Sequence, residues 1–296
     1  MTSVSIVIVN YNNYNDTIEY VKQLLIQKNI LLHIVIVDNA SKNLSFSKLK
    51  EAFGDTENIY IIKSIKNGGY SYGNNLGLHF IEMNKLSNFV IISNNDIELV
   101  NENFISEFVL KYNQLPKNKG FASPVMYNGA LPSSVAARKL PNYLDELLRS
   151  SILLNKILNK KFDYDFIKSN GSLKVDCLPG SFFLGTIELF HLINYFDENV
   201  FLFGEEKILA FKIKQKQLQN YLICDMKFIH NTSTSISQTY NLKERYLIGL
   251  KSRIYFWKNY IKLSKPKLFI LKYISILFIY ENLLIMMFKN ALLKRN

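Results

Sequence analysis

The sequence predicts an α/β protein with a mostly parallel sheet, helices on its sides and a helical extension at the C-terminus. Three observations carry this prediction. Short apolar runs rich in Ile and Val alternate with segments of helical spacing across about residues 1–100. Polar clusters follow these runs, and the chain keeps helical character from residue 240 to its end. Alternating strands and helices are typical of βαβ units, in which neighbouring strands run parallel.

Four buried strands are expected in the N-terminal part, because each is a short apolar run bounded by polar residues. They are Val4–Val9, His33–Val37, Ile59–Lys63 and Phe89–Ser93. Helices are expected at Asp16–Gln27 and Tyr72–Met83, and a further strand at Leu173–Leu178. Met1–Asn10 turns apolar at once without a basic segment, which favours a first strand over a signal peptide.

The second half of the chain predicts more helix. Residues 138–162 read as one or two amphipathic helices, which either cover the site or touch a membrane, or else simply pack on the domain. Leu268–Met287 is very apolar but contains Lys272 and Glu281, so a helix on a membrane surface or packed on the domain is favoured over a spanning one. We expect a domain over 1–240, with halves at about 1–100 and 101–240, and an extension over 241–296.

The formal net charge of +12 points to an anionic partner. Basic residues near the C-terminus surround apolar stretches, which suits an anionic bilayer better than nucleic acid, and no nucleic-acid-binding motif is found. A lysine-rich solubilising surface is the alternative. The two cysteines, Cys177 and Cys224, lack metal-ligand spacing and predict no disulfide, which fits a reducing cytoplasm.

Four polar clusters fall where strands end or a helix begins. They are Asn10–Asn13, Asp38–Ser41, Asn67–Gly69 and Asn94–Asp96. In open parallel sheets, ligands bind beyond the carboxyl ends of the strands, so four such loops at one edge predict a binding site.

The residue types in these loops suit a nucleotide diphosphate sugar. Asp38 can accept hydrogen bonds from a base or a ribose, or it can cap a turn through its own side chain. Gly68 and Gly69 allow the backbone to approach a ligand closely because glycine lacks a Cβ and tolerates positive φ, although such a pair is often only a turn. Asn75, about one helical turn or so later, is placed to reach the same ligand.

Seven motifs in order carry a resemblance to a known family. The run SIVIVNYNN, VDNAS, NGGYSYGNNLG, SNNDI, LPGSFFLG, FDENVFLFGEE and IHNTSTS resembles family 2 glycosyltransferases of the GT-A fold over about residues 2–237. The similarity is greatest to the rhamnosyltransferase-like branch, which builds bacterial cell-surface polysaccharides. Each motif alone is weak, but their order and spacing together are specific.

The resemblance implies an inverting transfer of a sugar from a nucleotide diphosphate sugar, such as dTDP-rhamnose or a UDP-sugar, to a saccharide acceptor. That acceptor is expected on a polyprenyl diphosphate at the inner face of the cell membrane, with the enzyme cytoplasmic and peripheral. The expected donor-binding residues are Asn10, Tyr11, Asp38, Asn67, Gly68, Gly69, Asn75, Asn94, Asn95 and Gly180.

A divalent cation, Mg²⁺ or Mn²⁺, is expected at Asp96. The family pattern is Asp-X-Asp or a variant that keeps the last Asp, and this sequence has Asn94, Asn95 and Asp96. Such a cation stabilises the charge that develops on the leaving diphosphate. His230 matches a position that completes the metal site in relatives, although a lone histidine is more often structural.

The expected general base is Glu206, which stands where the family has a base Asp, with Glu205 as the fallback. Ile208 replaces a further family Asp, which puts the base assignment, and activity itself, in doubt. The resemblance places the loop around Gly180 near the transferred sugar, and it gives Asp197 and Glu198 a role in shaping the approach to the base. A solvated acidic turn at Glu205–Glu206 is the alternative.

Two other function classes stay open. A nucleotidyltransferase can use a similar sheet, but it usually has a Gly-rich basic loop after the first strand, where this chain has NYNNYND. A catalytically degenerate relative that serves as a partner subunit is compatible with the altered GEEKIL segment. The sequence has no Ser-His-Asp triad, Walker loop or cysteine-based metal site.

Overall fold

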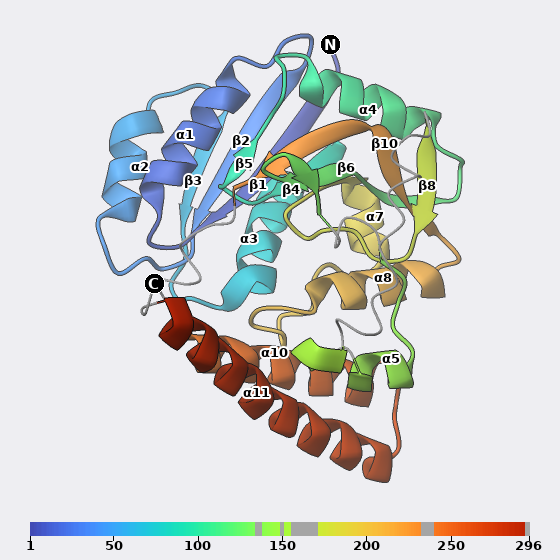
Figure 1. Ribbon diagram of the computed structural model, residues 1–296. Coiled ribbons are helices and arrows are strands. Elements are labelled where there is room, and N and C mark those ends of the chain that lie inside the picture. Colours follow the sequence, from blue (N-terminus) through green and yellow to red (C-terminus); the bar gives the residue numbers. More distant parts are fainter. Residues whose placement is uncertain (134–137, 149–150, 155–170, 232–239, 294–296) are drawn as a thin grey trace.

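The computed structural model shows one mixed ten-stranded sheet with helices on its sides, and two long helices along one edge of the molecule (Figure 1). It describes residues 1–133, 138–148, 151–154, 171–231 and 240–293. The expected α/β class, with helices flanking a central sheet, is confirmed.

The four N-terminal strands lie side by side and parallel, in the order β3-β2-β1-β4. Their bounds are β1 (Ser3–Asn10), β2 (Leu31–Asp38), β3 (Ile59–Lys63) and β4 (Phe89–Ser93). All four were predicted. Their apolar runs are buried because helices cover the sheet, as is typical of parallel sheets.

The second half of the sheet is mixed. Its order continues β9-β6-β10-β5, with β7 beside β6 and β8 beside β10. The bounds are β5 (Ile97–Glu98), β6 (Lys119–Asn128), β7 (Leu131–Pro132), β8 (Ser172–Val175), β9 (Phe182–Thr186) and β10 (Gln219–His230). Because β9 runs antiparallel to β4, its first residue pairs with Ser93, the last residue of β4. This pairing brings the loop before β9 to the rim where the parallel strands end.

Six helices accompany the strands of the described α/β body. They are α1 (Tyr14–Leu25), α2 (Ser45–Phe53), α3 (Gly69–Met83), α4 (Phe104–Gln114), α7 (Ile187–Leu192) and α8 (Glu205–Gln215). Of these, α1 and α3 were predicted from the sequence, whereas α2, α4, α7 and α8 were not. Helix α2 buries Leu49 and Phe53 through a short apolar face, and its nine residues give only a weak periodic signal.

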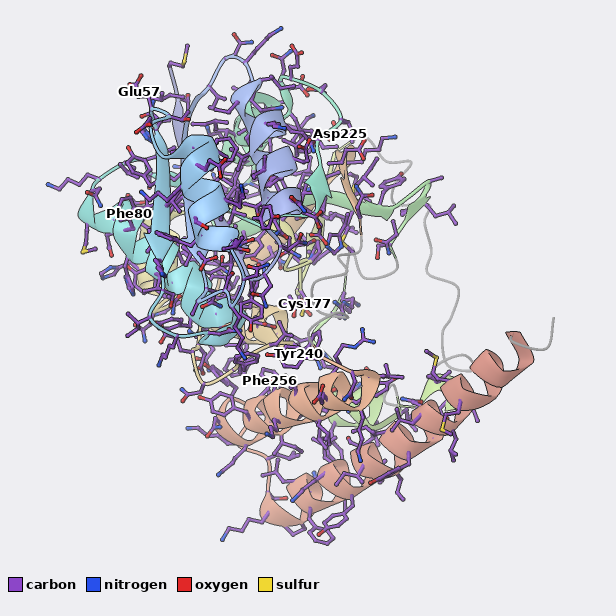
Figure 2. All side chains as sticks on the ribbon, turned by 90° about the vertical axis from the view of Figure 1, so that its left-hand side faces the viewer. Glu57, Phe80, Cys177, Asp225, Tyr240 and Phe256 are labelled. Carbon is purple, nitrogen blue, oxygen red and sulfur yellow. The ribbon has the colours of Figure 1, made fainter. Side chains whose placement is uncertain are left out.

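The C-terminal helices α10 (Leu242–Asn259) and α11 (Lys265–Leu293) confirm the helical extension. They pack, together with the short α5 (Tyr143–Leu148), around a second apolar cluster (Figures 1 and 2). Its buried members are Val200, Ile208, Phe256, Trp257 and Leu271. The position at which the family has a further acid, Ile208, is therefore a core position that joins α8 to the extension.

Helix α11 presents two different faces. Leu271 is fully buried against the protein, and the Glu281 carboxylate accepts a hydrogen bond of 2.7 Å from the hydroxyl of Ser151. The outward side carries exposed apolar side chains, listed in order along the helix as Phe269, Ile270, Tyr273, Leu277, Tyr280, Leu284 and Met287. Over Lys265–Met287 this is the one helix among the described residues that is long and apolar enough to cross a membrane.

Two remaining expectations concern residues 138–162 and the cysteines. Helix α5 accounts for part of the predicted amphipathic stretch, and residues 149–150 and 155–162 lie outside the described residues. Cys177 and Cys224 are both buried and free.

Candidate active site

Three of the polar clusters meet at one rim of the sheet, where β1, β2 and β4 end. Asn10 lies opposite Asp38 in the parallel pairing of β1 with β2, and its amide Nδ2 donates to Asp38 Oδ2 at 2.9 Å. The third cluster follows β4, and the backbone N–H of Asn94 donates to the carbonyl of Ser181 at 2.8 Å. The predicted convergence of the loops is therefore present in the fold.

A buried hydroxyl connects these loops. Thr17 Oγ1 donates to Asn10 Oδ1 at 2.9 Å and accepts from Asn95 Nδ2 at the same distance. All three residues are buried. Asn10 uses both ends of its amide on protein partners and so positions the loops, and its expected contact with the donor stays a prediction. The amide nitrogen of Asn95 is engaged in the same way, and Thr17 was missed because nothing in the sequence marks it.

Asp38 is fully buried and both of its carboxylate oxygens accept hydrogen bonds. One accepts from Asn10, and the other accepts from the backbone N–H of Ser41 at 3.1 Å. The turn-capping alternative is therefore present in the structure, and a contact between Asp38 and a nucleotide stays a prediction. Tyr11 lies half-buried at the same rim. Burial raises the pKa of Tyr240, and the neighbouring Tyr11 adds to this effect.

The glycines at the start of α3 make a close approach to the protein's own backbone. Gly69 has φ +87°, and a Cβ there would lie 2.0 Å from the carbonyl oxygen of Phe201. Asn67 Oδ1 accepts from the backbone N–H of Gly69 at 3.1 Å, and a Cβ on Gly68 would meet the ring of Tyr72. The loop around Phe201 fills the space beside Gly69, and a contact between these glycines and a ligand stays a prediction.

Asn75 is likewise engaged within the protein. Its Nδ2 donates to the carbonyl of Phe196 at 3.1 Å and to Glu198 Oε1 at 2.8 Å, while its Oδ1 accepts from the backbone N–H of Phe196 at 3.0 Å. These contacts leave Asn75 only 4% exposed. Asn75 therefore fixes the loop that leads into α8, and its expected contact with the nucleotide sugar stays a prediction.

Asp96 and His230 meet because β5 pairs antiparallel with the end of β10. His230 Nε2 lies 3.1 Å from Asp96 Oδ1, and it also lies 3.4 Å from Asn94 Nδ2. The Asp96 side chain is 3% exposed, and neither of its oxygens accepts a hydrogen bond of normal geometry from a described residue. A buried carboxylate without donors fits a cation, which would take the place of the missing hydrogen bonds.

No group of three or more His, Cys, Asp or Glu side chains with metal-binding geometry is found among the described residues. Asp96 and His230 therefore offer at most two protein ligands. That number suits Mg²⁺, which usually keeps waters and uses one or two carboxylates together with substrate phosphates. The chemistry of this pair fits an ion that the donor diphosphate helps to hold.

Tyr70 lies in the first turn of α3, within the electrostatic influence of Asp96 and of the acidic pair Glu205–Glu206. Its hydroxyl donates to the carbonyl of Gly180 at 2.5 Å. Burial raises its pKa well above the ordinary value, and the charges of Glu205, Glu206 and Asp96 add to this effect. Tyr70 was not singled out from the sequence, although it belongs to the NGGYS motif.

The acidic pair begins α8, and its two members differ in environment. Glu205 is 7% exposed, and burial, followed by the charge of Glu206, raises its pKa. Glu206 is half-buried and lies against Gly180, where a Cβ would come within 3.1 Å of Glu206 Oε1. A glycine at this loop therefore makes room for the Glu206 carboxylate, which suits Glu206 better than Glu205 for accepting a proton from a substrate.

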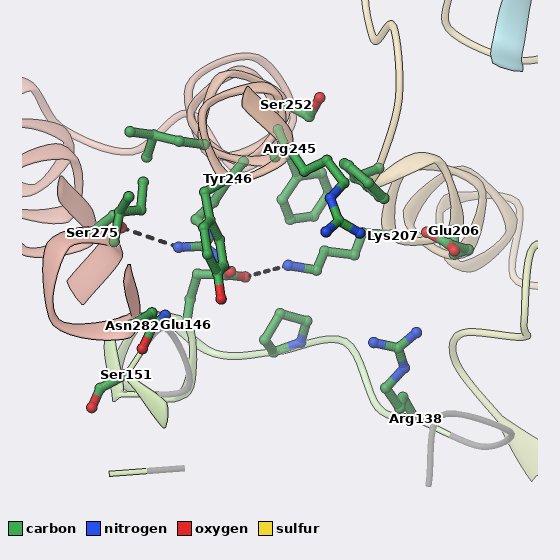
Figure 3. A pocket seen from close by; sticks show the side chains of 18 of the residues that line it. Arg138, Glu146, Ser151, Glu206, Lys207, Arg245, Tyr246, Ser252, Ser275 and Asn282 are labelled. Atoms are coloured by element: carbon green, nitrogen blue, oxygen red, sulfur yellow. Dashed lines mark hydrogen bonds and ion pairs between the residues drawn. The ribbon is translucent and has the colours of Figure 1, made fainter. Parts of the chain in front are cut away.

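Glu206 also lines a cavity of about 640 Å³ (Figure 3). The cavity lies between α8 and the helices of the C-terminal cluster, and its wall includes Glu146, Lys207, Arg245 and Arg253. A volume of this size is in the range of sites for small organic ligands. The carboxylate predicted to be the base thus lies in the wall of a cavity between α8 and the C-terminal helices.

Comparisons with known proteins agree with this geometry. A model of the family described as "Glycosyl transferase family 2" matches residues 5–162, more than half of the chain. The low-salt glycan biosynthesis hexosyltransferase Agl10 of Haloferax volcanii is 26% identical over 233 residues, which cover 78% of this chain and 68% of Agl10.

Solved structures show the same fold. The mannosyltransferase PcManGT of Pyrobaculum calidifontis, solved with GDP-Man and Mn²⁺, matches with a TM-score of 0.60 at 13% identity, covering 92% of this chain and 69% of that one. Residues 1–349 of S. aureus TarS, solved with UDP, match with a TM-score of 0.54 at 14% identity, covering 92% and 70%. At these identities the likeness shows the fold alone, which is the GT-A fold.

The family match and the geometry support the same assignment. The family model spans the four parallel strands and the loops that follow them. The loops after β1, β2 and β4 meet at one rim of the sheet, where Asp96 lies beside His230. On these grounds the chain belongs to glycosyltransferase family 2.

Proposed function

We propose that this protein is an inverting glycosyltransferase that transfers a sugar from a nucleotide diphosphate sugar to a saccharide acceptor, with a divalent cation held by Asp96. The observation that carries the proposal is the buried Asp96 carboxylate, which accepts no hydrogen bond of normal geometry from the residues that the structure describes and lies 3.1 Å from His230. In this proposal residues 1–240 form the catalytic domain, with the donor in its first half and the acceptor in its second.

Asp96 and His230 would hold Mg²⁺ or Mn²⁺. Such a cation stabilises the negative charge that develops on the diphosphate as the sugar leaves. Asn94, next to the pair, offers a neutral carbonyl oxygen to the donor. The rim loops around Asp38 and Tyr11 provide hydrogen-bond partners for the base and the ribose.

Glu206 is the proposed general base. A single displacement at the anomeric carbon needs a carboxylate that removes the proton of the attacking hydroxyl, and this reaction inverts the configuration. Glu205 fits less well because its raised pKa keeps it protonated near neutral pH. The hydroxyl of Tyr70 holds the Gly180 backbone, against which the Glu206 side chain lies.

The donor is proposed from the resemblance, which points to dTDP-rhamnose or a UDP-sugar and to the synthesis of bacterial cell-surface polysaccharide. The acceptor is proposed to be a saccharide on a polyprenyl diphosphate, met at the cytoplasmic face of the cell membrane. Two features at α11 support binding to an anionic membrane surface. They are the exposed apolar stripe of the helix and the exposed lysines in and before it, Lys262, Lys265, Lys267 and Lys272. Apolar and basic residues together favour a peripheral helix at the interface.

The experiment is a thermal-shift screen of nucleotide sugars with and without Mn²⁺, followed by a hydrolysis assay of the ligand that binds. A ligand at a hundred times its dissociation constant stabilises the folded state by about 2.7 kcal/mol. Asp96→Ala should lower metal-dependent hydrolysis by about a hundredfold or more. Asp55→Ala, an exposed acid on the same domain, is the matched control and should behave as the unmutated protein.

A second outcome would assign a different function. Ile208 occupies a core position where the family has an acid, which is compatible with a degenerate subunit. If no nucleotide sugar raises the melting temperature and none is hydrolysed, while the protein forms a stable complex with another component of polysaccharide assembly, the partner-subunit function replaces the enzyme.

A further inference from the structure

The cavity beside Glu206 has an unusual charge balance. Five basic and two acidic side chains line it, so its wall is cationic. It is bounded by α5, α8, α10, α11 and the segment that contains Arg138. Part of this positive charge is balanced by ion pairs within the protein.

Glu146 balances two of the basic groups. Its carboxylate lies 2.7 Å from Lys207 Nζ and 2.9 Å from Arg253 Nε, and its side chain is only 5% exposed. Burial alone would raise the pKa of Glu146, but the charges of Lys207 and Arg253 outweigh burial and lower it. Arg253 also donates to Ser275 Oγ at 3.1 Å (Figure 3). This cluster is a structural ion network that ties α5 and α8 to the C-terminal helices.

Arg138 and Arg245 differ from that network. Neither forms an ion pair with a described residue, and the Nε atom of each is buried without a hydrogen-bond acceptor there. Figure 3 shows both guanidinium groups extending from opposite walls toward the same space, with Glu206 nearby on α8. A buried donor without an acceptor is unfavourable, and two of them in one cavity point to a ligand that supplies acceptor oxygens.

We propose that Arg138 and Arg245 bind a phosphate or diphosphate group of the acceptor, and so fix the acceptor with its reactive hydroxyl at Glu206. This inference rests on the proposed function, because it takes Glu206 as the base. Guanidinium groups match the geometry of phosphate oxygens and bind them through paired hydrogen bonds. Since the anion site and the carboxylate share one cavity, the phosphate belongs to the same molecule as the hydroxyl, close to the sugar that carries it.

The binding test uses farnesyl diphosphate as a soluble probe and isothermal titration calorimetry on the full chain. EDTA is present throughout, so that a cation at Asp96 cannot recruit the diphosphate. The unmutated protein should bind farnesyl diphosphate, inorganic pyrophosphate should compete, and farnesol should not bind. Arg138→Gln and Arg245→Gln should each weaken binding roughly ten- to hundredfold, as expected for the loss of a charge-assisted hydrogen bond.

Two variants serve as controls. Lys216→Gln removes an exposed positive charge at the end of α8 and should leave the affinity unchanged. Arg245→Lys keeps the charge but loses the fork, and should retain part of the affinity if the Gln variant proves unstable.

The outcomes separate the two sources of phosphate. Weakened probe binding with an unchanged thermal shift by nucleotide sugar and Mn²⁺ supports an acceptor site. Equal probe affinity in all variants overturns the proposal, and so does a loss of the nucleotide-sugar shift in Arg138→Gln or Arg245→Gln, because the anion would then be the donor's. Failure of the proposed function would instead appear as no hydrolysis of any nucleotide sugar, which leaves the calorimetry unaffected.

Discussion

Replacing Glu205 with Gln should stabilise the protein in a pH-dependent manner. Burial and then the neighbouring charge of Glu206 raise the pKa of Glu205 from 4.5 to about 8. Between these values the folded protein keeps a proton that the unfolded chain has lost, so the stability of the unmutated protein falls as the pH rises through this window. Glutamine has the shape of the protonated carboxyl group and no charge at any pH, so the variant is spared this loss.

The size of the effect follows from the shift. One pKa unit corresponds to about 1.4 kcal/mol. The advantage of Glu205→Gln should be near zero at about pH 4.5, grow by about 1.4 kcal/mol for each further pH unit, and reach about 4 kcal/mol at pH 7.5. At roughly 2 °C per kcal/mol for a large domain, the melting temperature should rise by about 8 °C at that pH.

The assay is thermal and urea unfolding of both proteins from pH 4.5 to 8.5. Glu57→Gln, at an exposed site, is the matched control and should follow the profile of the unmutated protein. Glu206→Gln removes only the second cause of the raised pKa, so its gain should be smaller. Parallel profiles for Glu205→Gln and the unmutated protein would refute the reasoning, since Glu205 would then ionise in the fold as freely as in the unfolded chain.

The same two variants distinguish the proposed base. Glu206→Gln should lower nucleotide-sugar hydrolysis by about a hundredfold or more, the usual contribution of a general base. Glu205→Gln should lower it far less. The reverse order would move the base assignment to Glu205.

Gly69→Ala should lower the free energy of unfolding in urea by several kcal/mol, because the new Cβ would lie 2.0 Å from a backbone carbonyl oxygen. Gly129 also has a positive φ but has open space beside it, so Gly129→Ala should cost only about 1 kcal/mol. Ile208→Asp restores the acid of the family pattern but buries a carboxylate in an apolar cluster, so it should lower the free energy of unfolding by about 3 kcal/mol or more. Ile65→Asp, at an exposed position, should leave the free energy of unfolding unchanged in the same assay. Thr17→Val should lower the free energy of unfolding by about 2 kcal/mol, because it removes the hydroxyl that bonds to Asn10 and Asn95. It should also broaden the amide signals of the rim loops in NMR spectra. Unchanged stability would contradict a shared buried network.

Local patterns predicted the elements because apolar periodicity reports burial directly. The four parallel strands were found because each is a continuous apolar run, and the resemblance placed the polar loops after them. The mixed second half of the sheet was not predicted, since strand direction depends on where the chain returns. Helix α2 was missed because nine residues show too little of a helical period.

The roles of single polar residues were harder to predict than their positions. Asn75 and Gly69 were expected to face a ligand, and the structure shows that both contact the loop over residues 196–201. Asn10 was expected at the donor, and the structure shows that it joins two loops. An amide side chain can hydrogen-bond to a ligand or to the protein backbone, and a glycine allows either to approach closely. The residue type therefore does not identify the partner, which depends on the segment that lies beside it in the fold.

The sequence by itself determined the α/β class, the parallel strands and the identity of the residues at their ends, because these features depend on residues close together in the chain. The tertiary structure decided which of them meet. Asn94 and His230 are 136 residues apart and come together only through the pairing of β5 with β10. Arg138 and Arg245 share a cavity only because the C-terminal helices fold back against α8 through Ile208. Such contacts depend on chain topology and packing, for which local periodicity carries no signal.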